Sequence, residues 1–334
     1  MSRFKLYLLF SIPLVAAGCF KDDTPVEPYI GTVTTIKNHI EKYQSYYDFE
    51  TNSVASYNTR DSWSLGFACG DNEFTICTNS GNNWFILNTG QININASINY
   101  PKKSIWSYDD QSLFPDSTAV KDWIAISAND TNYTNNVYLL GKYSGTAYSS
   151  IYRIKFLKVT REEYVIYYQT DTIESTGKTV IIQKNPIKTF IYYSFSEDAI
   201  KDIEPEKSTW DIVFGSYYDL VTELGVTAPY LVRGVLINQN GTVACIDSTE
   251  SFESINAEKI STLNLSDKRN TIGYNWKSVT INETSNTATY TINLLYNYII
   301  QTQEGNYFKM RFLSYTLDGE NGYPSFVAEK ITMP

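Results

Sequence analysis

The sequence has few of the residues on which most catalytic sites are built. It contains one histidine, His39, and no G-x-S-x-G segment, so it lacks the base and the nucleophile turn of a hydrolase triad. Glycine-rich phosphate loops are absent as well. The acid pairs Asp109–Asp110 and Glu162–Glu163 are adjacent in sequence, so in strands they would point to opposite faces. We therefore expect a binding protein and not an enzyme.

Positive charge and long apolar runs are also scarce. The formal net charge is −9, which argues against nucleic acid or an anionic lipid surface as the main partner. Beyond residue 18 no segment approaches the roughly 20 apolar residues that a membrane-spanning helix needs. The sequence therefore predicts an exported, folded body.

The N-terminus carries a targeting signal. Arg3 and Lys5 precede an apolar core at 6–15, which is too short to span a bilayer and fits an export signal. The small residues 16–18 then lead into Cys19, which resembles the lipobox cysteine of bacterial lipoproteins. An ordinary signal peptide that contains a cysteine is the alternative.

The resemblance to a lipobox implies that residues 1–18 are a lipoprotein signal peptide and that 19–30 form a lipidated tether. Acylation of Cys19 would anchor the chain durably, because each buried CH₂ contributes about 0.8 kcal/mol. Lys21, Asp22 and Asp23 resemble the surface-export signal of Bacteroidota lipoproteins. We expect an outer-membrane protein that is exposed at the cell surface.

Two further cysteines flank a predicted hairpin turn. Cys69 and Cys77 enclose "GDNE", and their even separation puts both side chains on one face of the hairpin. An oxidising compartment would permit a disulfide. A four-residue loop would instead set Cys69 opposite Phe74, which favours two free buried thiols. No other ligands cluster nearby, so a zinc site is not expected.

The chain contains an internal repeat. Three segments recur in the same order, and the spacing between the copies grows along the chain. These segments are "YYDF" at 46–49 and "YYSF" at 192–195, "SWSLGF" at 62–67 and "TWDIVF" at 209–214, and "YRIKFLKV" at 152–159 and "FKMRFLSY" at 308–315. Two tandem copies of one domain, at 31–170 and 180–334, explain this pattern most simply.

Both copies are predicted to be β structure. Trp63, Leu65 and Phe67 alternate with small residues, as in a half-buried strand, and 152–156 and 308–312 show the same period. Further strands are predicted at 164–168 and 296–300, and turns at 238–241 and 318–322. The chief helical candidate is 252–263. The predicted fold class is all-β, with two tandem antiparallel β-sheet domains.

The repeated segments carry a family resemblance. "YYSF", "TWDIVF" and the stretch "GNYFKMRFLSY…GYPSF" at 305–326 resemble the HmuY family of Bacteroidota lipoproteins, and "TNSG" at 78–81 is similar to a segment after the family's Trp strand. The resemblance implies an all-β fold. It also implies capture of haem, which the best-known members bind at the cell surface and pass to an outer-membrane transporter.

The sequence offers few residues that could bind haem or another ligand. The family's type member holds haem iron through two histidines, which this chain does not have, so the family's ligand roles have no counterpart here. Some relatives use methionine, but Met310 is expected to pack in the core. The alternative function is capture of a glycan or peptide, for which Trp84 and Trp106 would offer aromatic platforms unless they plug the ends of a sandwich.

Overall fold

The computed structural model describes residues 32–333, apart from 72, 100–104, 115, 128–129, 173–174, 224, 283 and 286. The predicted signal peptide at 1–18 and the residues Cys19, Lys21, Asp22 and Asp23 therefore lie outside the described residues. Residues from Thr32 onward form one compact unit of antiparallel sheets, which confirms the all-β prediction. In this part of the chain, no helix has the length and hydrophobicity to span a membrane.

The first lobe contains strands β4 to β14. A five-stranded sheet has the order β12-β11-β10-β9-β6, and a four-stranded sheet has the order β14-β13-β4-β5. The strands are β4 (Leu65–Ala68), β5 (Ile76–Thr78), β6 (Trp84–Asn88), β9 (Tyr138–Tyr143), β10 (Tyr148–Val159), β11 (Glu163–Thr170), β12 (Lys178–Gln183), β13 (Phe190–Ser194) and β14 (Ala199–Lys201), with a separate ribbon of β7 (Ile124–Ser127) and β8 (Asp130–Tyr133). The short helices η1 (Ser80–Asn82) and η3 (Lys121–Trp123) also belong to this lobe.

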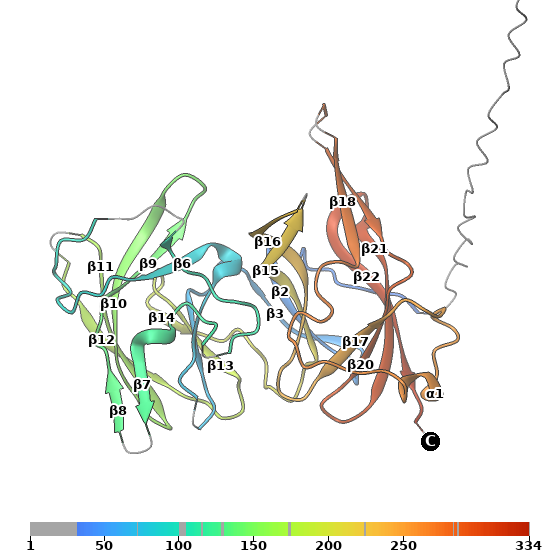
Figure 1. The fold of residues 1–334 in the computed structure, drawn as a ribbon, viewed down its shortest axis with the longest axis horizontal. Coiled ribbons are helices and arrows are strands. Elements are labelled where there is room, and N and C mark those ends of the chain that lie inside the picture. Colours follow the sequence, from blue (N-terminus) through green and yellow to red (C-terminus); the bar gives the residue numbers. More distant parts are fainter. Residues whose placement is uncertain are drawn as a thin grey trace, which may run out of the picture. The chain divides into compact units, whose positions relative to one another are not determined.

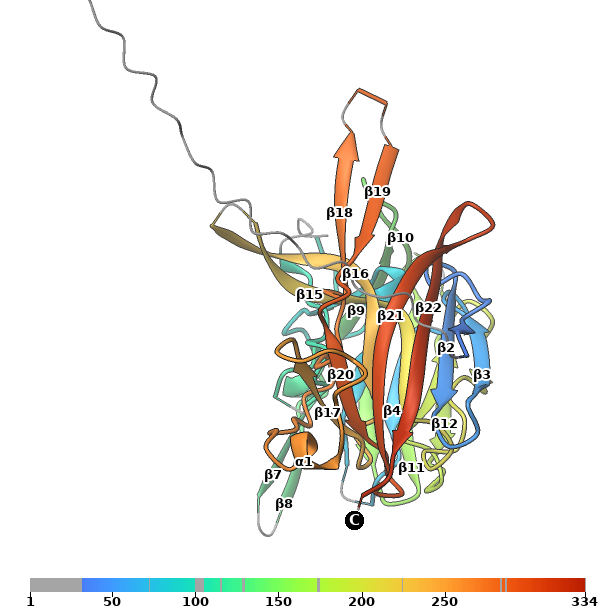
Figure 2. The same ribbon diagram turned by 90° about the vertical axis from the view of Figure 1, so that its right-hand side faces the viewer.

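The second lobe repeats this arrangement. Its five-stranded sheet has the order β1-β22-β21-β20-β17, and its four-stranded sheet has the order β16-β15-β2-β3. The strands are β1 (Thr34–Thr35), β2 (Tyr43–Asp48), β3 (Ser53–Thr59), β15 (Ile212–Glu223), β16 (Val226–Ile237), β17 (Val243–Asp247), β20 (Asn297–Gln301), β21 (Tyr307–Leu317) and β22 (Glu320–Ile331), with a ribbon of β18 (Lys277–Asn282) and β19 (Thr287–Ile292). Figure 2 shows this ribbon beside β21 and β22.

Each lobe is assembled from both halves of the sequence. The opening strands β1, β2 and β3 pair with β22 and β15, whereas β12 and β13, from the second half, pair with β11 and β4. Figure 1 shows the blue strands β2 and β3 beside the golden β15 and β16. The strands of each lobe therefore come from both of the predicted tandem copies, 31–170 and 180–334. The exchange is sterically possible because "YYDF" and "YYSF" offer nearly the same side chains to either sheet.

The exchanged strands have equivalent registers. Tyr193 on β13 lies opposite Leu65 on β4, and Tyr47 on β2 lies opposite Ile212 on β15. In the sequence repeat, Tyr193 corresponds to Tyr47 and Leu65 to Ile212. The two four-stranded sheets thus use equivalent strand pairings. In each sheet, however, one of the paired strands comes from the other copy of the repeat.

A loop with the same side-chain hydrogen bond closes each four-stranded sheet. The side-chain amide of Asn79 donates a hydrogen bond to the carbonyl oxygen of Trp63 at 2.9 Å, and that of Asn238 donates to Trp210 at 2.8 Å. In the first lobe this loop includes Gly81, where an added Cβ would lie 2.1 Å from the carbonyl oxygen of Ser216 on β15. The "TNSG" segment therefore fixes a close approach between the lobes.

The strand predicted to be half-buried is buried on both faces. Leu65 and Phe67 point into the core of the first lobe, as predicted. Trp63 and Ala68 belong to a second apolar cluster on the outer face of the same sheet, together with Tyr192. That face is covered because it meets the outer face of the sheet β16-β15-β2-β3 in a contact that we call the seam. Period-two alternation does not distinguish such a covered face from a solvated one.

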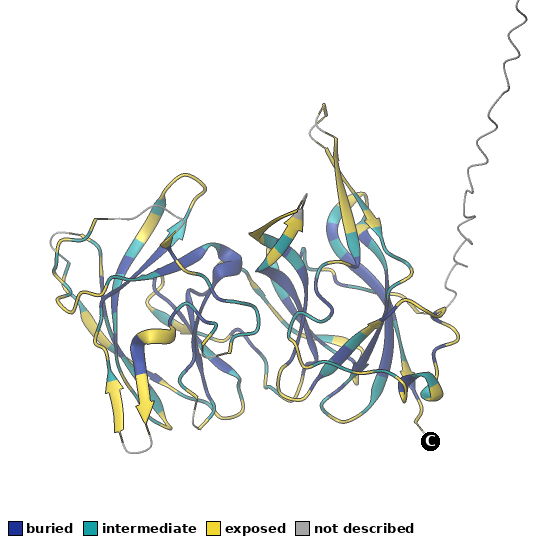
Figure 3. Cartoon of the chain, viewed as in Figure 1, coloured by how far each residue is buried: buried dark blue, intermediate teal, exposed yellow. Residues whose placement is uncertain are grey.

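The predicted turn at 318–322 is a tight hairpin. Leu317 and Glu320 pair directly, and Asp318 and Gly319 between them both have positive φ, at 51° and 84°. A two-residue loop of this kind requires positive φ at both positions, which explains the Asp-Gly sequence. Burial along the other hairpins is low towards their tips, as Figure 3 shows for β18 and β19.

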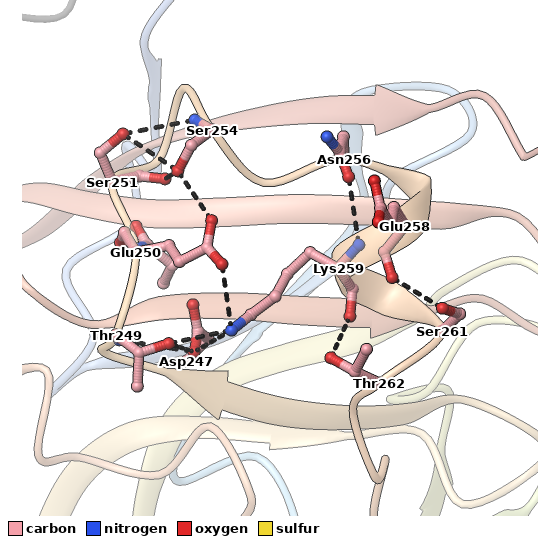
Figure 4. Close-up of polar contacts among 11 residues, drawn as sticks. Asp247, Thr249, Glu250, Ser251, Ser254, Asn256, Glu258, Lys259, Ser261 and Thr262 are labelled. Carbon is pink, nitrogen blue, oxygen red and sulfur yellow. Dashed lines mark hydrogen bonds and ion pairs between the residues drawn. The ribbon is translucent and has the colours of Figure 1, made fainter.

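The predicted helix at 252–263 is shorter than expected. Only α1 (Ala257–Ile260) is helical, with the Asn256 side chain accepting a hydrogen bond from the backbone N–H of Lys259. Figure 4 shows the Lys259 ammonium between Thr249, Asp247 and Glu250, with its Nζ 3.4 Å from a carboxylate oxygen of each acid. These contacts fasten the single turn to the end of β17.

Candidate functional site

A charged groove opens at the first crossing of the chain between the lobes. It has a volume of about 290 Å³ and lies where the connection from β3 to β4 passes the edge of the first lobe. We call it the cationic groove. Its lining residues are Glu41, Lys42, Tyr43, Thr59, Arg60, Asp61, Asn82 and Lys142.

Three cations of the groove form no ion pair. Among the described residues, Lys42, Arg60 and Lys142 also form no side-chain hydrogen bond, although the Lys142 ammonium lies 5.9 Å from the ring centre of Trp84. The Glu41 carboxylate is paired with Arg233, at 3.1 Å from its Nε, and the Asp61 carboxylate lines the groove and attracts Arg60 without forming an ion pair. With three cations and two carboxylates in its lining, the groove presents a small excess of positive charge in a chain whose formal net charge is −9.

Arg233, behind the groove, repels Arg60, which lines it. Burial and the neighbouring Arg233 guanidinium lower the pKa of Arg60, against the opposing attraction of Glu41 and Asp61. Burial lowers the pKa of Lys277 to about 7, and repulsion from Arg233 contributes. The Lys277 ammonium donates a hydrogen bond to the carbonyl oxygen of Arg233 at 2.5 Å and lies 4.1 Å from the ring centre of Trp276. Such crowding of like charges disfavours the free protein and would be relieved by an anion.

A smaller cavity lies deeper in the seam. Its volume is about 70 Å³, and Tyr46, Trp63, Tyr192, Tyr217 and Arg269 contribute to its walls. The Tyr217 hydroxyl is buried and has no hydrogen-bond partner among the described residues. At roughly 10–15 Å³ for one water, the cavity can hold a few waters and is too small for a tetrapyrrole.

Asp109 closes one end of this cavity. Its carboxylate accepts hydrogen bonds from the Thr78 hydroxyl and the Ala119 backbone N–H, both at 2.7 Å. Burial raises the pKa of Asp109 to about 6, against the opposing effect of these hydrogen bonds. Asp109 thus holds the "TNSG" segment in place, which is a structural role.

The two tryptophans proposed as ligand platforms are both buried. Trp84 is 3% exposed, and Trp106 is 4% exposed. The Trp106 ring stacks on Tyr148 with ring centres 4.0 Å apart. Neither indole presents a face to solvent, because Trp84 packs in the core of the first lobe and Trp106 packs in an apolar cluster with Phe85, Leu139 and Tyr218. The aromatic platforms predicted from their polar sequence context are therefore not formed.

The remaining predicted residues also lie in the protein interior. Met310 is fully buried in the core of the second lobe, which agrees with a packing role. Cys69 and Cys77 are free buried thiols, and Cys77 lies opposite Gly66 on the neighbouring strand. Burial raises the pKa of both thiols.

His39 is largely enclosed, although its sequence neighbours Asn38, Glu41 and Lys42 are polar. Its side chain is 12% exposed and packs edge-on against Tyr323 at 5.2 Å between ring centres. Its Nδ1 accepts a hydrogen bond from the Glu41 backbone N–H at 3.2 Å, and its Nε2 lies 3.9 Å from Glu320. The ring closes over Gly322, where a Cβ would lie 2.5 Å from it, and this explains its burial.

The described residues do not fit haem held by histidine or methionine. His39 is enclosed, Met310 is buried in the core, and the part of the chain that the structure describes contains no cluster of three or more His, Cys, Asp or Glu side chains suited to a metal. Neither cavity is therefore lined by a histidine or a methionine. We derive no step through iron.

The groove residues were missed by sequence reasoning. Lys42, Arg60 and Lys142 lie on three separate segments, and none of them belongs to a periodic pattern or a motif. Their neighbours in the sequence look like ordinary surface positions. Only the exchange of β2 and β3 into the second lobe brings the β3–β4 connection to the edge of the first lobe.

Comparison with known proteins bears on the second half of the chain. Residues 187–327 match the model of the HmuY family, described as HmuY protein, which confirms the resemblance over that range. No curated protein matches the sequence. Among solved structures, the apo form of PinO from Porphyromonas gingivitis is similar with 8% identity and a TM-score of 0.27, covering 91% of this chain and 100% of that one. Residues 187–327 of this chain are therefore similar to the HmuY family.

Proposed function

We propose that this protein is a lipoprotein of the outer membrane that faces the cell exterior and captures a small ligand in the cationic groove. The family match over residues 187–327 is the observation that carries the proposal. It makes haem or a related tetrapyrrole the leading ligand, delivered to an outer-membrane transporter. The unpaired cations of the groove support a ligand with carboxylate groups, which tetrapyrroles carry.

An acidic glycan or peptide is the second candidate ligand. It is favoured by the poor fit to iron ligation, since such a ligand would use the same cations and would need no axial ligand. Both candidates are bound and released unchanged, so the proposal assigns no catalysis.

The anchor is tested by the substitution Cys19→Ser. We expect the variant to leave the membrane fraction, because acylation requires the thiol and no other segment of the sequence can hold the chain in a bilayer. Fractionation followed by immunoblotting measures the distribution. Cys245→Ser is the control, and it should stay with the membranes. A membrane pool that is unchanged in Cys19→Ser would contradict the lipobox assignment.

Haem capture is tested by titration with haemin and with metal-free protoporphyrin IX at neutral pH. We expect both to bind with similar affinity, and we expect a haemin spectrum that is high-spin or five-coordinate, because no histidine pair is available. The His39→Ala variant should give the same spectrum as the parent protein. A low-spin spectrum that disappears in His39→Ala would show that histidine ligates the iron. Binding of neither tetrapyrrole would leave the glycan or peptide as the ligand.

A further inference from the structure

The charge of the groove is not a by-product of the repeated fold. The register of the strands and the sequence repeat match each groove cation with a position in the other lobe. The matched pairs are Lys42 with Lys188, Arg60 with Lys207, and Lys142 with Thr302.

The matched positions are largely neutralised. The Lys188 ammonium pairs with Asp202 at 2.9 Å and also donates a hydrogen bond to the carbonyl oxygen of Glu204. Thr302 is an uncharged residue at the position of Lys142. Only Lys207 keeps a side chain without an ionic partner among the described residues, so the cluster of free cations is particular to one of the two crossings.

The cations of the groove are held together at an energetic cost. Arg60 and Lys277 both lie within the repulsive field of Arg233, and Arg233 has Glu41 as its paired acid. Partly buried like charges disfavour one another more than exposed ones, because the surrounding protein screens them less than water does. An arrangement of this kind, which is absent from the matched crossing, is expected where a ligand supplies the missing negative charge.

We propose that the cationic groove binds a small polyanion, meaning a ligand that carries two or more carboxylate, phosphate or sulfate groups. The proposal rests on the proposed function and names the chemistry of its ligand. Arg60 would contribute a planar fork of donors that matches carboxylate or phosphate oxygens in pairs. Lys42 and Lys142 would contribute point charges on the other walls, and Asn82 belongs to the same lining.

The groove suits a compact ligand. Its volume of about 290 Å³ is close to the lower limit of about 300 Å³ for small-molecule pockets. A tetrapyrrole would therefore place its carboxylate groups in the groove and most of its ring outside. A citrate-sized or pyrophosphate-sized anion would be enclosed more completely.

The test is calorimetric titration of the purified protein with citrate and, separately, with inorganic pyrophosphate at low ionic strength. We expect at least one of them to bind, with an affinity that falls steeply as sodium chloride is added, because exposed ionic contacts are screened. A preference for citrate would assign the groove to carboxylates, and a preference for pyrophosphate would assign it to phosphates. The absence of binding by both anions would overturn the proposal.

Three variants locate the site. Arg60→Gln and Lys142→Gln should each weaken binding by about tenfold or more, as expected when a hydrogen bond to a charged group is removed. Lys207→Ala, at the matched crossing, should change the affinity by less than about twofold, as for an isolated surface charge. If Lys207→Ala and Arg60→Gln lower the affinity equally, the anion responds only to the net charge of the protein. That result would contradict a specific site in the groove.

The fold of the variants is monitored by thermal unfolding without ligand. Arg60→Gln should unfold at nearly the same temperature as the parent protein, because Arg60 forms no ion pair and the repulsion from Arg233 is opposed by the attraction of Glu41 and Asp61. The two proposals fail in different ways. If haemin binds equally well to the parent and to Arg60→Gln, and neither anion binds, capture of haem stands and the groove is wrong. If the anions bind as expected and haemin does not, the groove stands and haem is wrong.

Discussion

Cleavage of the chain between β11 and β12 is expected to leave the two fragments associated in one particle. Strands β1, β2 and β3 of the first fragment complete the sheets of the second lobe, and β12 and β13 of the second fragment complete those of the first lobe. Each fragment therefore contributes main-chain hydrogen bonds and buried apolar side chains to both lobes. A protease site placed within 172–177 and size-exclusion chromatography of the cut protein provide the measurement.

The second fragment made alone provides the contrast. Residues 178–334 contain β12 and β13 without their partners β11 and β4, and β15 without its partner β2. Because Tyr193 and Tyr47 hold equivalent registers, β13 can take the place of β2 beside β15. We expect this fragment to fold by that re-pairing and not to bind the cut first half once folded. Separation of the two halves immediately after cleavage under native conditions would show that the strands are not exchanged.

Truncation of either seam tryptophan is expected to lower the free energy of unfolding by about 3–5 kcal/mol, the usual cost of a large aromatic removed from a packed interior. Trp63 is 7% exposed and Trp210 is 4% exposed. Trp63 packs edge-on against Tyr192 at 4.7 Å between ring centres, and Trp210 packs against Tyr46 at 5.0 Å. Chemical denaturation of Trp63→Ala and Trp210→Ala measures both costs.

Phenylalanine at the same two positions separates packing from hydrogen bonding. The Trp63 indole N–H donates to the Gln44 side-chain oxygen at 2.9 Å, whereas the Trp210 indole N–H is buried with no partner among the described residues. Trp63→Phe should therefore cost about 1 kcal/mol more than Trp210→Phe, because only the first substitution removes a hydrogen bond. Equal costs for the two substitutions would mean that the Gln44 contact does not contribute to stability.

Much of the fold was predictable because its strands carry local signals. The alternation at 152–156 and 308–312 appears as β10 and β21, and the aromatic runs at 164–168 and 296–300 appear within β11 and β20. The Asp-Gly turn at 318–319 requires backbone conformations that few other residue pairs adopt. Such features depend on residues that are close together in the sequence, so they can be predicted from one sequence alone.

The strand exchange could not be predicted from the same signals. "YYDF" and "YYSF" specify a buried strand, and they do not specify which copy of β4 or β15 the strand will join. The repeat itself makes the two choices nearly equal in side-chain packing. The selection depends on long-range contacts, such as Gly81 against Ser216, that have no local signature.

The candidate site was less predictable than the fold. Trp84 and Trp106 lie in polar sequence surroundings, but the segments around them fold over the indoles and remove them from solvent. Lys42, Arg60 and Lys142 have ordinary surface neighbours in the sequence and become a cluster only through tertiary structure. A binding site made from connections between strands has no periodicity to reveal it.

The pairing of β1 with β22 has a consequence for how the protein is made. Thr34 lies opposite Phe326, so the first described strand meets its partner only after nearly the whole chain has been synthesised. Pairings between residues so distant in the sequence form slowly, and they leave strand edges exposed in the meantime. The second lobe therefore cannot be completed before β22 has been made. Strands β2 and β3 can already pair with each other, but β1 and the edge of β2 that meets β15 have to wait for their partners or be held by a chaperone.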